Sequence, residues 1–283
     1  MPELPEVEAV ARTLRPLVRG QTVFRCRVLH PIAARPQGAR VLRRGVEGQR
    51  ILGVERQGKY LLLRLARGCL VMHFRLNGQL VWFPRRVGRR GPFFRASRGE
   101  ARPLHIDVAL EMQRGTLGFV DRRHFGRVQW YPRAEDCPGV RALGMDPLSL
   151  DSSLQQLLEL LGRSRRPLKL FLMDQTRIAG LGNIYANEAL SDAWLSPRRP
   201  AHRLTPGEAA RLHKGIVNVL RRALECCLHP APDFQNPEWW FQGLESILNV
   251  YGREGQPCRW CRRPIRRIEQ GGRSSYFCAH CQR

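Results

Sequence analysis

The sequence has no apolar run near the roughly 20 residues that a membrane-spanning helix needs, so we expect no membrane segment. Its opening, Met-Pro-Glu-Leu-Pro-Glu, has neither the basic nor the apolar segment of a secretory signal. We therefore expect a cytosolic protein. Internal repeats are also absent, which argues against a solenoid or a propeller.

Acidic residues are scarce. Only 24 Asp and Glu residues stand against 48 Lys and Arg residues, which leaves a formal net charge of +24. Most of the basic residues are Arg, whose planar guanidinium forms paired hydrogen bonds to phosphate. A polyanionic partner is the natural interpretation, and nucleic acid is the commonest one. The alternative is a genome biased toward Arg codons, which would raise the charge without any partner.

The cysteines follow no pattern over most of the chain. Five of them are scattered, and we interpret them as buried free thiols: Cys26, Cys69, Cys137, Cys226 and Cys227. The other four form two Cys-x2-Cys pairs separated by sixteen residues: Cys258 with Cys261, and Cys278 with Cys281. Four thiolates at this spacing predict one tetrahedral Zn2+ site. Two disulfides are the alternative, which a cytosolic location disfavours.

A segment this short cannot build a hydrophobic core of its own, so we expect the zinc ion to supply its folding free energy. Gly271-Gly272 near the middle of the segment suits a β-hairpin. Six arginines lie within it, which makes the predicted zinc module basic. A basic zinc hairpin indicates contact with nucleic acid and indicates nothing about catalysis.

The first half of the chain predicts one helix followed by many short strands. Residues 2–19 have apolar residues at helical spacing, with Pro and acids in the first turn. From 22 to 131, short apolar or alternating runs separated by turn residues predict an antiparallel sandwich or barrel. Residues 84–103 interrupt this pattern with seven Arg residues among Gly, Pro and Ser. We expect an exposed, mobile loop there, either a DNA contact or a plain solvated insertion.

The second half of the chain predicts helices. A helix capped by Asp151 is followed by short helices at 168–175 and 183–193. The capping box Thr205–Glu208 opens a long helix through Arg222, and 229–243 is predicted to be a loop. The predicted domain boundaries are an N-terminal domain at 1–132, a linker at 133–151, a helical domain at 152–245 and the zinc module at 246–283.

The N-terminus carries candidate chemistry. Pro2 is small enough to permit removal of Met1, which would expose a secondary amine. An α-amino group titrates at about pH 7.7–8.0, so a useful fraction is unprotonated at neutral pH. Attack by this amine on a sugar C1′ would give an iminium that displaces the base and acidifies the C2′ proton, which permits strand scission.

Glu3 and Glu6 share a helix face beside this amine. Glu3 is the better candidate for protonating the opening sugar ring. Judged by spacing alone, the alternative is an ordinary first-turn helix proline with two acids that favour the helix dipole.

Several motifs, in order along the chain, resemble the formamidopyrimidine-DNA glycosylase/endonuclease VIII family. They are Met1-Pro-Glu-Leu-Pro-Glu-Val-Glu8, Gly58-Lys59-Tyr60, Asp121-x-x-x-Phe125-Gly126, Leu172-Met-Asp-Gln175, Gly180-Leu-Gly-Asn-Ile-Tyr-Ala-Asn187-Glu188 and the terminal cysteine pattern. The Glu-Leu-Pro-Glu start is most like the bacterial formamidopyrimidine-DNA glycosylase branch.

The resemblance implies an α+β multidomain fold. An N-terminal helix with an antiparallel β-sandwich would form the catalytic domain. A helix-two-turn-helix DNA-binding domain and a C-terminal β-hairpin zinc finger would follow it. The implied function is a bifunctional DNA glycosylase/AP lyase of base excision repair. It would excise oxidised purines through a Pro2 iminium and nick the strand by β,δ-elimination. The implied partner is double-stranded DNA with an oxidised base or an abasic site, bound by a monomer in the bacterial cytoplasm with one structural Zn2+.

The resemblance also assigns roles to residues. Pro2 would be the nucleophile, Glu3 the proton donor, Glu6 a support and Lys59 a cleft lysine that binds phosphate beside the lesion. A flipped base leaves a gap in the stack, which Leu76, Arg123 and Phe125 would fill. The expected DNA-contacting set is Lys59, His73, Leu76, Arg123, Phe125, Lys169, Asn183 and Arg273. Without the family resemblance, an ordinary surface lysine in a turn is an equally good interpretation of Lys59, and a core histidine is an equally good interpretation of His73.

Departures from the family pattern leave the lesion preference open. Leu76 stands where the family often has Met, and Asp121-Arg-Arg-His-Phe-Gly126 where it often has Asp-Pro-Arg-Arg-Phe-Gly. The segment expected to cover the flipped base reads His229-Pro-Ala-Pro-Asp-Phe234 in place of Gly-Gly-Thr-Thr. Two alternatives therefore stand: an endonuclease VIII-like glycosylase for oxidised pyrimidines, and a zinc-dependent DNA-binding protein without catalysis.

Overall fold

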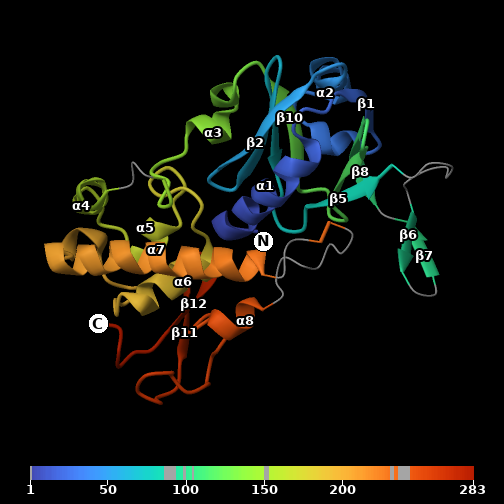
Figure 1. Ribbon diagram of the computed structural model, residues 1–283. Coiled ribbons are helices and arrows are strands. Elements are labelled where there is room, and N and C mark those ends of the chain that lie inside the picture. The colour runs from blue at the N-terminus through green and yellow to red at the C-terminus, as the bar shows by residue number, and fades with distance from the viewer. Residues whose placement is uncertain are drawn as a thin grey trace. The chain divides into compact units, whose positions relative to one another are not determined.

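The structure is a computed structural model that describes residues 2–85, 94–97, 100–103, 105–149, 153–229, 233–234 and 243–283. The chain divides into two compact units (Figure 1). The first comprises 1–2, 6–141 and 228–242, and the second comprises 3–5, 142–227 and 243–283. Residues 3–5 therefore belong with the second unit, although they begin the helix that continues into the first.

The first unit contains two four-stranded antiparallel sheets. One has the order β1-β8-β9-β5, with β1 at Val23–Val28, β8 at Ile106–Met112, β9 at Gly115–Val120 and β5 at Gln79–Pro84. The other has the order β10-β4-β3-β2, with β10 at Arg127–Tyr131, β4 at Cys69–His73, β3 at Tyr60–Leu65 and β2 at Ile51–Gln57. The predicted β-sandwich and its strands are confirmed.

Helix α1 (Leu4–Val18) confirms the predicted N-terminal helix. Its apolar residues recur every three or four positions, which places them on one face. All of these are fully buried: Leu4, Val7, Val10, Ala11, Leu14 and Val18. At about 25 cal/mol per Å2 of apolar surface, each buried Val or Leu stabilises the fold by roughly 1.5–3 kcal/mol relative to an exposed one.

Helix α2 (Ala39–Val46) was not predicted, because Gly45 and four basic or small residues hide its periodicity. The helix nevertheless buries Leu42 and Val46 completely. Gly45 packs so tightly on the indole of Trp130 that a Cβ there would collide with the ring. The glycine is therefore a packing requirement, and its low helix propensity is overcome by burial.

The Arg-rich segment 84–103 contains a two-stranded antiparallel hairpin, so the prediction of a loop was wrong there. Strand β6 (Phe94–Ser97) pairs with β7 (Glu100–Pro103). Backbone pairing of two four-residue strands uses only N–H and C=O groups, which a composition rich in Arg and Gly does not reveal. Residues 86–93, 98–99 and 104 lie outside the described residues.

Helices dominate the second unit. They are α4 (Leu154–Gly162), α5 (Leu168–Leu172), α6 (Asn183–Asp192), α7 (Pro206–Leu228) and α8 (Leu244–Ile247), followed by the hairpin of β11 (Arg266–Gln270) and β12 (Arg273–Phe277). The capping box is confirmed, since the Thr205 N–H donates to Glu208 at 2.9 Å and the Glu208 N–H donates to the Thr205 hydroxyl at 3.4 Å. Helix α7 runs past the predicted end at Arg222, because Ala223, Leu224 and Cys227 continue its buried stripe.

The cap predicted for α4 was wrong. The structure places Ser153 at the N-cap, and its Oγ accepts the Gln156 N–H at 3.1 Å. Asp151 itself lies outside the described residues. Asp, Ser and Ser follow one another here and all favour N-caps, so the sequence alone does not choose between them. The segment predicted to be a linker contains the short helices η2 (Ala134–Asp136) and α3 (Pro138–Arg141).

Two further predictions are settled in part. Among the described residues the five scattered cysteines form no disulfide, and all except the half-buried Cys226 are buried. Burial raises the pKa of Cys26 and of Cys69 to about 12, so both thiols stay protonated at neutral pH.

Most of the predicted loop 229–243 lies outside the described residues. In the described part of the chain, no helix combines the length and apolarity that a bilayer span requires.

Candidate active site and metal centre

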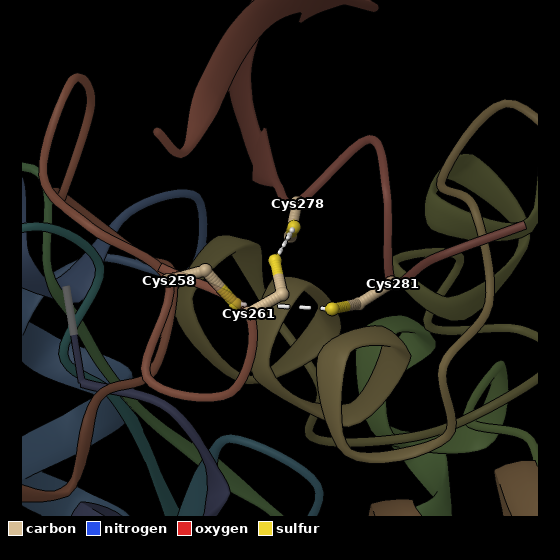
Figure 2. Close-up of side chains that lie close together, drawn as sticks. All are labelled: Cys258, Cys261, Cys278 and Cys281. Atoms are coloured by element: carbon tan, nitrogen blue, oxygen red, sulfur yellow. Dashed lines mark hydrogen bonds between the residues drawn. The ribbon is translucent and has the colours of Figure 1, made fainter. Parts of the chain in front are cut away.

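The four paired cysteines meet at one point in the second unit. Figure 2 shows their side chains converging from the two Cys-x2-Cys segments. The four Sγ atoms all lie within 4.8 Å of one another, with 3.4 Å between Cys261 and Cys278 and 4.0 Å between Cys258 and Cys281. Zn–S bonds of about 2.3 Å in a tetrahedron place sulfurs roughly 3.8 Å apart. The predicted donor set therefore fits one zinc ion.

Tight backbone turns position these thiols. The Arg262 N–H donates to the Cys258 carbonyl at 3.0 Å, and the Cys258 N–H donates to the Arg263 carbonyl at 2.8 Å. Arg262, directly after Cys261, adopts a φ of +64° where the backbone turns back toward Cys258. At the second pair, the Gln282 side chain accepts the Cys278 N–H at 2.9 Å. The segment has few buried apolar residues, so a bound zinc ion would be its main source of folding free energy.

Glu3, the residue after Pro2, binds the N-terminus of α6. Its carboxylate accepts the backbone N–H groups of Gly182 at 2.6 Å, Ile184 at 2.9 Å and Tyr185 at 3.4 Å. These are the N–H groups that a helix start leaves unsatisfied. Gly182 occupies the N-cap and has no side chain to satisfy them, so Glu3 supplies the cap from 179 residues away in sequence.

The turn that receives Glu3 explains the glycines of its motif. Gly180 has a φ of +91°, and a Cβ there would lie 2.5 Å from Leu4 Cδ1. The Leu4 N–H donates to the Gly180 carbonyl at 3.1 Å, which fixes the chain beside Glu3. Gln175 braces the same turn, because its amide donates to the Leu181 carbonyl at 2.7 Å and accepts the Gly180 N–H at 3.0 Å.

Two residues in the middle of α6, Asn187 and Glu188, bind the segment that contains the four cysteines. Glu188 is buried and accepts three backbone N–H groups, from Asn249 at 2.7 Å, Val250 at 2.9 Å and Tyr251 at 2.8 Å. Burial raises the pKa of Glu188, and these N–H groups oppose the rise. Asn187 accepts the Tyr276 N–H of β12 at 2.7 Å. These two motif residues therefore attach the hairpin and the segment before it to α6.

Three residues expected to contact DNA lie in this unit. Asn183 is the first residue of α6 and is half-buried. Arg273 is exposed at the start of β12, after Gly271 and Gly272 with positive φ. Lys169 is fully buried, and its ammonium donates to the carbonyls of Ser274 at 2.8 Å and Arg273 at 3.5 Å.

Lys169 therefore lies behind Arg273 and fixes its backbone. Burial, and secondarily the Arg273 charge, lowers the pKa of Lys169 to about 8. The sequence could not show this, because the two residues are 104 positions apart.

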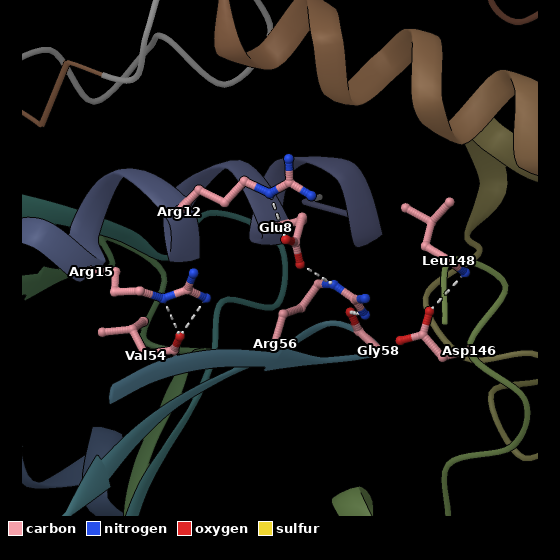
Figure 3. Close-up of polar contacts among 8 residues, drawn as sticks. All are labelled: Glu8, Arg12, Arg15, Val54, Arg56, Gly58, Asp146 and Leu148. Atoms are coloured by element: carbon pink, nitrogen blue, oxygen red, sulfur yellow. Dashed lines mark hydrogen bonds and ion pairs between the residues drawn. The ribbon is translucent and has the colours of Figure 1, made fainter. Parts of the chain in front are cut away.

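In the first unit, Glu6 and Lys59 are both buried, with exposures of 1% and 7%. Lys59 sits in the two-residue turn between β2 and β3, after Gly58 with a φ of +54°. Arg56 donates to the Gly58 carbonyl at 3.3 Å and to Glu8 of α1 at 2.9 Å (Figure 3). The start of α1 is thereby connected to the turn that carries Lys59.

Glu8 is a structural residue that the sequence did not single out. It accepts hydrogen bonds from Arg12 at 2.8 Å and Arg56 at 2.9 Å (Figure 3). Burial acts to raise the pKa of Glu8, but the two guanidinium groups outweigh it and hold the pKa below its ordinary value. Arg15 extends the contact by donating twice to the Val54 carbonyl of β2, at 3.0 and 2.8 Å. In the sequence, the spacing of four residues between Glu8 and Arg12 predicts only their own ion pair on one helix face, and it does not predict the bond to Arg56.

Three side chains that the resemblance assigns to filling the base stack are found on turns of the first unit. Leu76 and Phe125 are exposed, with 43% and 44% of their surface accessible. The Arg123 guanidinium lies 5.0 Å from the centre of the Phe125 ring, in cation–π contact. Buried Asp121 holds this turn by accepting the N–H groups of Arg123 at 3.0 Å and Gly126 at 2.6 Å.

His73 has a bracing contact in the structure. Its Nδ1 accepts the Arg75 N–H at 3.0 Å, and its ring packs edge-on against Tyr60 with centres 4.6 Å apart. Burial, followed by the Arg75 and Lys59 charges, lowers the pKa of His73 to about 3. His73 is therefore neutral at physiological pH and stabilises the turn that carries Leu76.

Comparison with known proteins covers almost the whole chain. Three family models match: the formamidopyrimidine-DNA glycosylase N-terminal domain at 1–128, the formamidopyrimidine-DNA glycosylase H2TH domain at 143–228, and the zinc finger found in FPG and IleRS at 255–283. Formamidopyrimidine-DNA glycosylase of Thermus thermophilus is 41% identical, over 100% of this chain and 98% of the relative.

Solved structures of the same family are similar to this chain over almost its whole length. The Lactococcus lactis Fpg (MutM) protein, in a complex with DNA containing N7-benzyl-Fapy-dG, superposes with a TM-score of 0.84 at 28% identity, over 99% of each chain. The same protein in a complex with DNA containing an oxidised pyrimidine gives the same values. The zinc-finger model spans all four converging cysteines, so the C-terminal segment is a zinc finger.

Replacing one cysteine should release the ion. We expect Cys258→Ala, purified without added metal, to fall from about one zinc per chain to nearly none, because three thiolates no longer close the site. Zinc is measured by elemental mass spectrometry. Cys26→Ala removes a buried thiol that has no part in the cluster and should keep its zinc. Full zinc retention by Cys258→Ala would remove this ligand assignment.

Proposed function

The chain belongs to the formamidopyrimidine-DNA glycosylase family, and we propose that it excises oxidised purines from DNA with Pro2 as its nucleophile. It is a DNA glycosylase of base excision repair. Its substrates in this proposal are 8-oxoguanine and formamidopyrimidines in double-stranded DNA, and also abasic sites. One observation carries the proposal: the carboxylate beside Pro2 is held by three backbone N–H groups of α6.

The first step replaces two bonds of C1′, to the base and to O4′, with a double bond to the Pro2 nitrogen. The Pro2 nitrogen, freed by removal of Met1, donates its lone pair to C1′ of the damaged nucleotide. The bond from C1′ to the base breaks, and the base leaves with the proton that the Pro2 nitrogen loses. Glu3 gives a proton to the ring oxygen as the C1′–O4′ bond opens, which leaves an iminium between Pro2 and C1′.

The hydrogen bonds to Glu3 suit this step. When Glu3 gives up its proton, negative charge develops on a carboxylate that already faces the N–H groups of Gly182, Ile184 and Tyr185. Such donors need no rearrangement during the reaction, so they stabilise the transition state more than water would. Oε2 accepts two of these N–H groups and Oε1 accepts one, so Oε1 is the oxygen that would hold the proton beforehand. Buried Glu6 supports Glu3 from one helical turn further along α1.

The lyase steps follow from the iminium. Its positive charge acidifies the C2′ hydrogen, and loss of that proton expels the 3′ phosphate by β-elimination. A second elimination, which begins with loss of the C4′ proton, expels the 5′ phosphate and leaves a gap in the strand where the damaged nucleotide was. Lys59 binds a phosphate flanking the lesion, and Asn183 and Arg273 bind further phosphates. His73 supports the turn of Leu76, and Lys169 supports the backbone of Arg273.

In this proposal, residues 1–132 form the catalytic domain, 133–151 the linker, 152–245 the helix-two-turn-helix domain and 246–283 the zinc finger. The enzyme acts as a monomer on DNA in the cytoplasm. The charge of +24 supplies the attraction to the phosphate backbone.

A second substrate class has its own support. A structure similar to this chain was solved with DNA containing an oxidised pyrimidine. The family's usual Gly-Gly-Thr-Thr is also missing at 229–234. Excision rates on duplexes with 8-oxoguanine opposite cytosine and with thymine glycol distinguish the two classes. The proposal predicts the faster rate on 8-oxoguanine, and the reverse order would favour an endonuclease VIII-like specificity.

Replacing the nucleophile should separate chemistry from binding. We expect Pro2→Gly to slow base excision by on the order of a thousandfold or more, because the secondary amine is lost. Its affinity for the same lesion duplex should stay close to that of the parent protein. Single-turnover excision and fluorescence anisotropy measure the two quantities.

Pro5→Gly is the matched control, since it makes the same change in the first turn of α1 three residues further along. It should excise at nearly the parent rate. Loss of duplex affinity in Pro2→Gly with an unchanged rate for the bound complex would count against the nucleophile. A parent protein that binds DNA without cleaving any lesion would indicate the non-catalytic alternative.

Removing the proposed wedge should slow excision from paired DNA. We expect Phe125→Ala to lose roughly tenfold in rate on a duplex lesion, equivalent to about 1.4 kcal/mol, because the vacated stack is no longer filled. On a single-stranded lesion substrate, which needs no unstacking from a partner, the loss should be small. Phe24→Ala, which removes a 56% exposed ring on β1 of the same unit, is the control and should change neither rate. Equal losses on both substrates would contradict the wedge.

A further inference from the structure

A second cluster of metal-binding side chains lies in the first unit, far in sequence from the cysteines. It consists of His30 just after β1, Asp107 on β8 and His124 in the turn 121–126. One donor atom from each residue lies within 4.8 Å of the other two. None of the three has a part in the proposed reaction.

The backbone builds this cluster. The Asp107 carbonyl accepts the N–H of Leu29 at 2.8 Å and of His30 at 3.1 Å, which fixes His30 beside Asp107. The His124 N–H donates to the Asp121 carbonyl at 3.1 Å, and His124 has a φ of +54°. A non-glycine residue adopts this left-handed conformation at some cost, so its surroundings must hold it there.

The carboxylate at the centre of the cluster lacks a partner on one side. Asp107 is completely buried, and its Oδ1 lies 2.9 Å from His124 Nδ1. Its Oδ2 is also buried and has no hydrogen-bond partner among the described residues. Leaving a buried carboxylate oxygen unsatisfied is costly, and natural proteins avoid it. The rings of His30 and His124 lie beside it with centres 4.7 Å apart.

We propose that His30, Asp107 and His124 bind one divalent transition-metal ion, with Zn2+ as the ion that best fits the donors. Two imidazoles and one carboxylate are a common zinc donor set, whereas Mg2+ and Ca2+ prefer oxygen donors alone. The ion would provide Asp107 Oδ2 with the partner it lacks. Zn–ligand bonds of about 2.0–2.2 Å require the donors to approach, which a rotation of the exposed His30 ring allows.

Three protein ligands leave a fourth position for water. A bound ion would also connect the turn 121–126 to the segment that follows β1. His124 lies between Arg123 and Phe125, so ion binding would restrict the turn that carries the wedge. Only this consequence rests on the proposed function. The binding of the ion does not.

The test counts zinc ions per chain after equilibrium dialysis of the zinc-loaded, full-length protein against buffered Zn2+. We expect two ions per chain in the parent protein and one in His30→Gln, which removes an exposed ligand and should leave the fold intact. His202→Gln removes an exposed histidine from the second unit and should keep two. Asp107→Asn should also bind one ion, since the amide is a poor zinc ligand.

Cobalt identifies the donors of the second ion. The first equivalent of Co2+ added to metal-free protein should give the intense thiolate-to-cobalt absorption of the cysteine site. The second should add only weak visible bands, and these should be missing in His30→Gln. One zinc per chain in the parent protein, or two in both His30→Gln and Asp107→Asn, would overturn the proposal. Neither readout involves DNA or catalysis, so a failure here is separate from a failure of the proposed glycosylase mechanism.

Discussion

The hydrogen bonds between the Glu3 carboxylate and the first turn of α6 are the interaction on which the rest depends. A helix start with glycine at its N-cap leaves its N–H groups unsatisfied, and Glu3 satisfies three of them. The same contact fixes the residue next to Pro2. Gly180 gives room for Leu4, and Gln175 holds the turn, so these motif residues serve one geometric purpose. A single contact thereby caps a helix and positions the proposed proton donor.

Helix α6 carries a second function along its length. Beyond Glu3's contact, Asn187 and Glu188 bind the backbone of β12 and of residues 249–251. Lys169 adds a buried ammonium behind Arg273. A zinc ion on the four cysteines would fold the finger locally, and these polar contacts attach the finger to the helices of its own unit. Burying so many polar groups is favourable only because each one accepts or donates hydrogen bonds.

Sequence patterns that span a few residues predicted the structural features that depend on interactions between neighbouring residues. Strand alternation, the Thr205–Glu208 capping box and the cysteine spacing each act over a few residues, and the structure confirms all three. Helix α2 and the β6–β7 hairpin were missed, since tight packing on Trp130 and backbone pairing leave little trace in composition. The partners of Glu3, Lys169 and Asp107 are distant in sequence, so no spacing rule could find them. For Pro2, chemistry suggested a nucleophile, and only the family resemblance favoured it over a plain helix proline.

The central claim is that a free secondary amine at Pro2, beside a carboxylic acid capping α6, bonds to deoxyribose. The most direct measurement reduces the enzyme–DNA intermediate with borohydride, digests the protein and locates the sugar remnant by mass spectrometry. The account predicts that the remnant is on the nitrogen of an N-terminal peptide that begins at Pro2. A remnant on Lys59 or another lysine, or Met1 still attached in protein that forms the adduct, would contradict it.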